Sequence, residues 1–204
     1  MDGNIISVLI PLASVILGSS ISWFASIYTT NKNIKAQNDA ILRNKAEVDR
    51  LQKINIYESK KRIYADIINA LFEAIRVRKK IPMAGIGITP VGLAFNNNYS
   101  ELIENIGDDI GYMGIVTVNR FYGILEKIRH DIIHFNNVTD NITNIDYSYL
   151  ILLSDFFSDN YIKILETKEE DLDINKMKNE MVPVYKNLVE KLQNDINAGQ
   201  LVQN

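Results

Sequence analysis

The sequence contains no cysteine, which excludes disulfide bonds, thiolate metal sites and cysteine nucleophiles. It also has no stretch of useful length in which apolar and polar residues alternate, so no β-strand is predicted. Signatures of catalysis are scarce as well, because no phosphate-binding loop and no pair of carboxylates stands out from the background. The sequence therefore predicts an all-α chain. We expect an interaction or effector module that needs no cofactor, rather than an enzyme.

Charge is missing from the N-terminal stretch, where no residue from Gly3 to Asn31 is Asp, Glu, Lys, Arg or His and Ile, Leu, Val, Ala and Ser dominate. About 20 apolar residues in a helix cross a hydrocarbon layer of about 30 Å. The run from Ile5 to Tyr28 therefore predicts a single transmembrane helix, with residues 1–31 as the membrane anchor. A cleaved signal peptide fits less well, because the chain opens Met1-Asp2-Gly3 without a basic segment and the apolar run is long. A buried core helix fits less well still, because the run has no polar face.

Basic residues follow the predicted span, whereas only Asp2 and the amino terminus precede it. The positive-inside rule then places the N-terminus outside and the long C-terminal part in the cytoplasm, at the inner (cytoplasmic) membrane of the cell. Residues 32–80 carry a net charge of +7, and residues 81–204 carry −9. We expect the basic segment to attract anionic lipid head groups and the acidic segment to be repelled from lipid and nucleic acid. The basic residues nearest the span are Lys32, Lys35, Arg43, Lys45 and Arg50.

Small residues recur at every fourth position of the predicted span, at Ser14, Gly18, Ser22 and Ser26. This spacing places them on one helix face, where small side chains let two transmembrane helices approach closely. The pattern predicts a homo-oligomer whose interface is this face. Two alternatives stay open: small residues are simply frequent here, or the serines line a pore in a higher oligomer that perturbs the membrane.

Helix-forming residues fill the chain from Asn31 to Lys80 without a glycine or proline. We interpret residues 32–56 as a helical stalk with weak coiled-coil character, because apolar residues lie seven apart but polar residues stand between them. Those apolar residues are Ile34, Ile41 and Val48, followed by Leu51, and the polar ones are Gln37 and Asn44. A broad apolar helical face begins after Tyr57 and predicts the first helix of a cytoplasmic bundle over residues 57–204. That face comprises Ile63, Tyr64, Ile67, Ile68, Leu71, Phe72 and Ile75.

The whole bundle is predicted to contain about four to five helices, separated by loops. Residues 81–95 form an apolar loop with two prolines and three glycines, and residues 136–146 form a polar loop. Asn98 and Glu101 have the spacing of a capping box. Helices are predicted over 115–135, over 147–165 and from 174 to about 199; Asp173 caps the last one, which is kinked near Pro183. Gly107, Gly111 and Gly114 permit either close packing or a break.

One motif contains residue types typical of catalytic or metal-binding sites. It is Arg129-His130-Asp131-Ile132-Ile133-His134, which contains both histidines of the chain. Two histidines four residues apart on a helix can share a metal ion. The zinc-protease pattern requires Glu directly after the first His, and Asp131 stands there instead. The plain interpretation is that all these residues are ordinary solvated or partly buried helix residues.

The spacing of Arg129 and His134 resembles the short Arg-and-His motif of the HEPN family of all-α ribonucleases and nucleic-acid-processing domains. The resemblance implies that Arg129 and His134 are catalytic, that two subunits form the cleft, and that RNA is cleaved without metal. A guanidinium stabilises phosphate charge, and an imidazole assists proton transfer. The acidic charge of residues 81–204 argues against nucleic acid as a partner. We therefore favour the bilayer, a second copy of the chain and an unidentified protein as partners, and keep the ribonuclease as the alternative.

Overall fold

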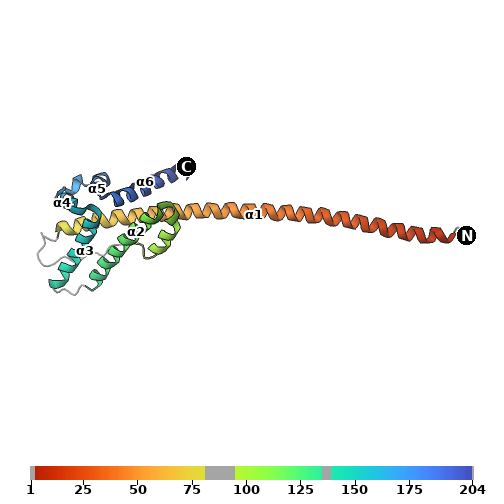
Figure 1. Cartoon of the computed structure of the whole chain (residues 1–204), viewed down its shortest axis with the longest axis horizontal. Helices are drawn as coiled ribbons and strands as arrows, with labels where there is room; N and C mark the ends of the chain where they lie inside the picture. Colours follow the sequence, from red (N-terminus) through yellow and green to blue (C-terminus); the bar gives the residue numbers. More distant parts are fainter. Residues whose placement is uncertain (1–2, 81–94, 135–138, 204) are drawn as a thin grey trace. The chain divides into compact units, whose positions relative to one another are not determined.

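The computed structural model describes the backbone of residues 3–80, 95–134 and 139–203, and the side chains of residues 14–80, 95–134 and 145–199. Within these ranges the regular structure is entirely helical, so the all-α prediction is confirmed (Figure 1). The chain divides into two compact units, Met1–Gln52 and Lys53–Asn204. Helix α1 (Gly3–Lys80) contributes to both. The predicted loop 81–95 lies outside the described residues except for Phe95.

The first unit is the N-terminal part of α1, and every described side chain in it is exposed. Large apolar residues are among them, including Leu17 at 63%, Trp23 at 61% and Phe24 at 65% exposure. Among the side chains that the structure describes, no helix offers a stretch long and apolar enough to cross a membrane. The predicted span begins at Ile5, and the side chains before Ser14 lie outside the described part. The membrane anchor therefore stays a prediction.

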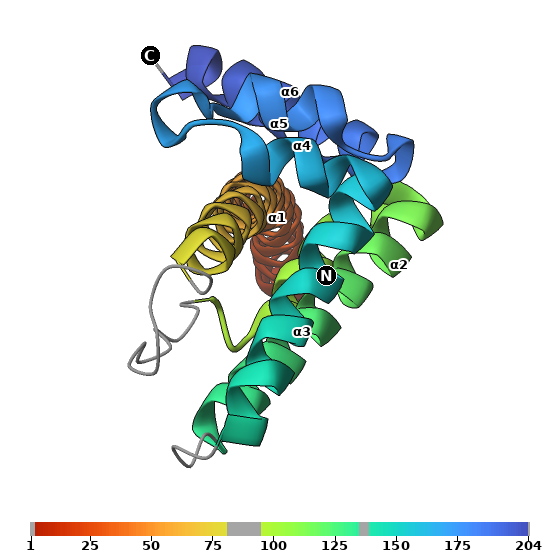
Figure 2. The same ribbon diagram turned by 90° about the vertical axis from the view of Figure 1, so that its left-hand side faces the viewer.

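The second unit is a helical bundle built around residues 53–80 of α1. Its other helices are α2 (Tyr99–Ile133), α3 (Thr139–Phe157), α4 (Tyr161–Glu166), α5 (Ile174–Glu180) and α6 (Pro183–Gln203), with 3₁₀ turns at Ser158–Asn160 and Glu169–Asp171. Helices α2 and α3 lie side by side on one side of this part of α1, and α4, α5 and α6 lie on the other (Figures 1 and 2).

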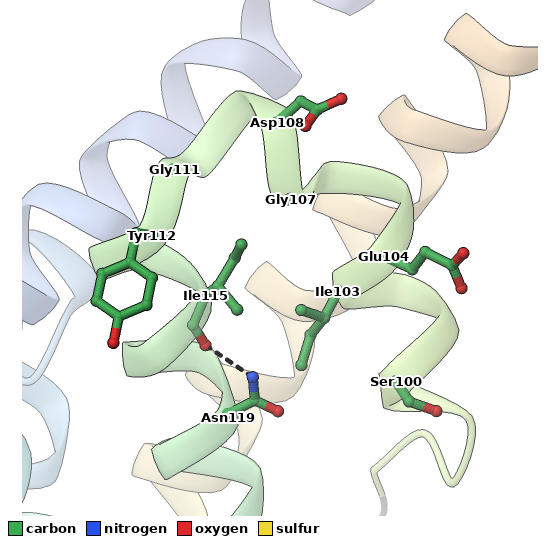
Figure 3. Close-up of a pocket in the computed structure, with 9 residues that line it drawn as sticks. All are labelled: Ser100, Ile103, Glu104, Gly107, Asp108, Gly111, Tyr112, Ile115 and Asn119. Carbon is green, nitrogen blue, oxygen red and sulfur yellow. Dashed lines mark hydrogen bonds between the residues drawn. The ribbon is translucent and has the colours of Figure 1, made fainter.

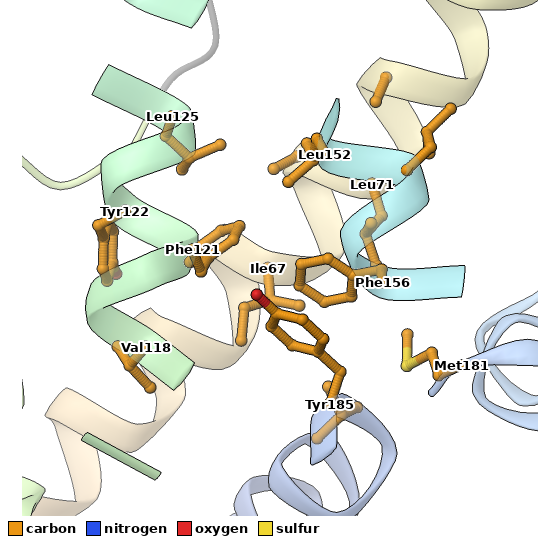
Figure 4. Packing of buried hydrophobic residues seen from close by; sticks show 14 of the residues in the cluster. Ile67, Leu71, Val118, Phe121, Tyr122, Leu125, Leu152, Phe156, Met181 and Tyr185 are labelled. Carbon is orange, nitrogen blue, oxygen red and sulfur yellow. The ribbon is translucent and has the colours of Figure 1, made fainter. Parts of the chain in front are cut away.

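The core of this bundle lies where the predicted helix faces meet. On α1 the predicted face is buried at Ile63, Ile67, Leu71 and Ile75, because a spacing of four residues places them on one side of the helix. Of its other predicted members, Tyr64 and Ile68 are half-buried and Phe72 is 37% exposed. Aromatic rings fill the centre: Phe121 of α2 meets Phe156 of α3 edge to face, and Phe156 stacks on Tyr185 of α6 with 3.7 Å between ring centroids (Figure 4). The face predicted for 115–135 is buried likewise, at Val118, Phe121, Tyr122, Leu125 and Ile128.

Helix α2 reverses at Gly111, whose backbone has φ 68° and ψ 175°. This conformation lies in the region that L-residues with a side chain rarely adopt, so glycine is the residue that permits the turn. Close packing accompanies the break, because a Cβ placed on Gly114 would lie 2.7 Å from Cβ of Ile110. The sequence left packing and breaking open as alternatives, and the structure contains both within four residues.

Three sequence-based boundaries are wrong. The polar run 136–146 is not a loop throughout, because α3 begins at Thr139, where buried Ile145 and the ion pair between Asp146 and Arg78 hold its first turns in place. The helix predicted over 147–165 breaks at Ser158, which has a left-handed φ of 49°. Pro183 does not kink one helix but begins α6 after α5 has ended, which fits proline because the first turn of a helix needs no N–H donor.

Of the two predicted helix caps, one is confirmed and the other is wrong. The Asp173 carboxylate accepts a hydrogen bond from the Lys176 N–H at 2.7 Å and caps α5 as predicted. Asn98 takes the N-cap position of α2, but its side chain makes no capping bond, so the predicted box with Glu101 does not form. The backbone N–H of Asn98 instead donates to Oδ1 of Asn96 at 2.9 Å, which leaves Glu101 without its capping partner.

Two partly buried polar contacts tie α1 to the rest of the bundle. The Lys60 ammonium, whose side chain is 10% exposed, lies 2.6 Å from Oδ2 of Asp109 on α2 and 2.7 Å from Oδ2 of Asp195 on α6. Burial lowers the pKa of Lys60, but its hydrogen bonds to both carboxylates outweigh burial and raise it overall. Burial raises the pKa of Asp66, which accepts a hydrogen bond from the Tyr122 hydroxyl at 2.8 Å.

Candidate functional site

Arg129 lies on the last part of α2, and its guanidinium is directed at the segment that precedes this helix. It donates a hydrogen bond to Oδ1 of Asn97 at 2.7 Å, and its Cζ lies 5.8 Å from the ring centroid of Phe95. The Glu126 carboxylate is 3.9 Å away, one turn earlier. The side chain is 43% exposed, so solvent and a charged ligand can reach it. An arginine in this setting can bind an anion only in competition with Glu126.

The two histidines lie one turn apart at the end of α2, where their rings stack with centroids 4.1 Å apart. His134 occupies the C-cap position, and its Nδ1 lies 2.8 Å from the carbonyl oxygen of His130. His130 is 67% exposed at its side chain and has Nδ1 3.5 Å from Oδ1 of Asp131. Among the residues described, no group of three or more His, Asp or Glu is arranged to hold a metal ion.

Asp131 links these histidines to α3 through a buried hydroxyl. The Ser148 Oγ, fully buried, donates to Oδ2 of Asp131 and accepts from the Lys127 ammonium at 2.8 Å. Lys127 also pairs with Asp131 at 2.7 Å. Burial alone raises the pKa of Asp131, but the hydrogen bonds from Lys127 and Ser148 outweigh it and hold the pKa below its usual value. Sequence analysis missed Ser148, which lies in another helix and carries no motif.

Arg129 and His134 thus share one helix but have different partners. Arg129 faces Asn97 and Phe95, whereas His134 stacks on His130. To cleave RNA together, Arg129 and His134 would both have to contact the same phosphate. The resemblance to the ribonuclease family implies that a second subunit forms part of the cleft that holds it. The catalytic assignment of Arg129 and His134 stays a prediction.

An apolar pocket of about 660 Å³ lies inside the reversal of α2, between its two arms (Figure 3). Ile103 on the first arm and Ile115 on the second form its sides, and Tyr112, 77% exposed, stands at its edge. Asn119 is anchored by a hydrogen bond from its amide to the carbonyl oxygen of Ile115 at 3.1 Å. Apart from the glycines at 107 and 111, nothing in the sequence predicts this pocket, because it depends on the antiparallel return of the helix.

A second, polar cleft of about 250 Å³ separates α1 from the start of α2. Four asparagines contribute to its lining, and Arg62 is the basic residue among its lining side chains. Asn105 donates to the buried Ser59 hydroxyl at 3.1 Å, so part of the lining is already satisfied internally. The cleft is therefore best explained as a polar contact region of the bundle.

The small residues predicted to mediate oligomerisation are all exposed in the first unit. A Cβ added to Gly18 would meet no atom within 4 Å, so this position is open to close approach by another helix. Neighbouring hydroxyls are satisfied within the helix: those of Ser19 and Ser20 donate to the carbonyl oxygen of Ile16 at 3.0 and 2.8 Å.

Comparisons of the chain with models of protein families, with curated proteins and with solved structures found no match.

Proposed function

We propose that the chain is a single-pass membrane protein that presents a helical interaction module to the cytoplasm and associates with copies of itself. One observation carries the proposal: no residue from Gly3 to Asn31 is charged, and the described apolar side chains of this stretch are exposed around the whole helix. Apolar side chains on every face of a helix need an apolar surrounding, which lipid supplies. The Ser19, Ser20 and Thr29 hydroxyls bond back to the helix, as hydroxyls must in hydrocarbon.

Alkaline carbonate extraction tests the anchor, and reporter fusions test its orientation. We expect the full chain to stay with the membranes, and a C-terminal reporter to be active only in the cytoplasm. Leu17→Arg together with Ile21→Arg should release the chain, because charges at the centre of a span are costly. Leu42→Arg in the exposed stalk is the matched control and should change nothing. Release of the unmodified chain by carbonate would refute the anchor.

The small-residue face is proposed as one contact between anchors. Gly18→Leu should reduce association in a membrane two-hybrid assay, because a leucine keeps two helices apart. Ala25→Leu adds a similar side chain off that face and should leave the signal unchanged. Equal signals for both variants would exclude the face defined by Ser14, Gly18, Ser22 and Ser26.

A membrane-tethered ribonuclease is the second candidate, favoured by the accessibility of Arg129 and His134. If it is correct, expression should slow growth and degrade RNA, and Arg129→Ala and His134→Ala should each abolish both effects. A pore-forming effector would instead admit dye into the cell, and this activity would survive both substitutions and be lost when the span is altered. If expression is harmless and these substitutions change nothing, both alternatives are excluded and the interaction module is the hypothesis that remains.

A further inference from the structure

A seven-residue repeat of exposed β-branched residues begins at Ile27, near the end of the predicted anchor, and continues into the stalk at Ile34, Ile41 and Val48. Their exposed fractions are 39%, 50%, 62% and 61%. Residues three positions later form the second row of the same stripe: Thr30, Gln37, Asn44 and Leu51. A seven-residue repeat with two rows of this spacing is the pattern by which helices supercoil around each other. We call this stripe, Ile27 to Leu51, the stalk seam.

Charge is excluded from the stalk seam. Eight charged residues lie between Ile27 and Leu51, and none occupies either row. The ion pair between Glu47 and Arg50, at 2.8 Å, also lies off the seam. Neighbouring positions on a solvated helix would carry charge on all sides, so an uncharged stripe along a charged helix marks a face that a partner covers.

The length of the stalk seam is sufficient for a partner helix. It covers 25 residues, roughly 37 Å of helix and about three and a half heptads. It ends where the next positions of the two rows are Asn55 and Glu58, beside the start of the second compact unit at Lys53. The side chains of the seam, residues 27–51, are all exposed within the first unit.

We propose that the stalk seam pairs with the same seam of a second copy in a parallel, in-register, two-stranded coiled coil. β-Branched residues in the first row favour two strands when leucine stands in the second, as Leu51 does at the end of the seam. In-register pairing places Asn44 opposite Asn44 and Gln37 opposite Gln37, so that each amide finds an amide partner, whereas antiparallel pairing would set them against apolar residues. The parallel direction also rests on the proposed function, because two copies anchored in one membrane point the same way.

The absence of cysteine makes a direct test possible, since one introduced cysteine is then the only thiol in the chain. Full-length Ile34→Cys and Val48→Cys should each form a covalent dimer on mild oxidation, because facing seam positions bring the two sulfurs within bonding range. Leu42→Cys is the matched control: it is 64% exposed, adjacent to Ile41, and off the seam. It should stay monomeric.

A second matched pair tests the apolar contact itself. Adding Ile41→Lys to the Val48→Cys chain should abolish the cross-link, whereas adding Leu42→Lys should leave it intact. Dimers that form only when Ile34→Cys and Asn44→Cys chains are mixed would show antiparallel pairing, in which a first-row position faces a second-row position, and would overturn the proposal. So would cross-linking at position 42 equal to that at the seam, or linkage to a different protein. The covalent band is read in both membrane and soluble fractions, so loss of the anchor and loss of the seam are told apart.

Discussion

The contact of Lys60 with Asp109 and Asp195 leads to a quantitative prediction. Replacing the lysine by methionine keeps the length of the side chain and removes the charge. A hydrogen bond to a charged group contributes roughly 1.5–3 kcal/mol when both partners are buried. Here the two carboxylates are 42% and 35% exposed and regain water in the variant, so we expect Lys60→Met to cost only about 1–2 kcal/mol in total.

Removing the carboxylates instead should cost more. Asp109→Ala with Asp195→Ala leaves the Lys60 ammonium, 10% exposed at its side chain, without a counter-charge, and an unpaired buried charge costs about 3–5 kcal/mol. A unit of this size loses roughly 2–4 °C of Tm per kcal/mol. We therefore expect a decrease of about 2–8 °C for Lys60→Met and a larger one for the double variant.

Thermal unfolding of the full chain in detergent, followed by near-ultraviolet circular dichroism, measures both effects. The buried tyrosines Tyr122, Tyr149 and Tyr185 all lie in the second unit, so their signal reports this unit and not the stalk. Adding Lys60→Met to the double variant should recover part of its loss, since the unpaired charge is then gone. If Lys60→Met is as destabilising as the double variant and gives no recovery, the lysine acts through packing and the electrostatic argument fails.

Three further predictions concern single positions of the same unit. Gly199→Ala should lower the Tm, because a Cβ there would lie 2.6 Å from two ring carbons of Tyr57, and an unchanged Tm would show that the ring moves freely aside. Asp66→Asn should keep the hydrogen bond from Tyr122 and stabilise the unit at pH 7. Burial raises the pKa of Asp66 in the folded state, so the stability of the unmodified chain should fall as pH rises from about 4 through that folded pKa. A series of melts at different pH should show this fall for the unmodified chain and not for the variant. Ser158→Gly should be neutral or stabilise by up to about 1 kcal/mol in the same melts, because glycine adopts the left-handed φ of 49° without strain, whereas a clear loss would mean that the serine side chain has a structural role.

Sequence periodicity predicted the buried faces because it is a local property. The centres of the faces from Ile63 to Ile75 and from Val118 to Ile128 are buried as expected, because the hydrophobic stripe of each helix packs into the one core, whereas Phe72 at the edge of the first face is exposed. The start of α3 at Thr139 was missed because asparagine and threonine are weak helix formers, and contacts from Ile145 and Asp146 to the bundle outweigh that preference. Local preference could not reveal these distant contacts.

The candidate site shows the same limit. Sequence spacing identified Arg129 and His134, but not that Asn97 and Phe95, more than 30 residues earlier, would bind the guanidinium. It also missed Ser148, because a buried serine between Asp131 and Lys127 is recognisable only once α2 and α3 lie side by side. The pocket within α2 depends on one backbone angle at Gly111, which a glycine permits but does not specify.

The contact of Lys60 with Asp195 also affects when the bundle can close during synthesis of the chain. Its partner Asp195 is 135 residues further along the chain, and at a synthesis rate of about 5–20 residues per second this interval lasts roughly 7–27 s. For most of that interval the apolar face of α1 from Ile63 to Ile75 has been made, but α6, which helps to cover it, has not. The reversal of α2 joins residues close in sequence and can form early, whereas closure by α6 has to wait until residues 183–203 have been made. A nascent chain that pauses before α6 would therefore expose this face to chaperones and proteases.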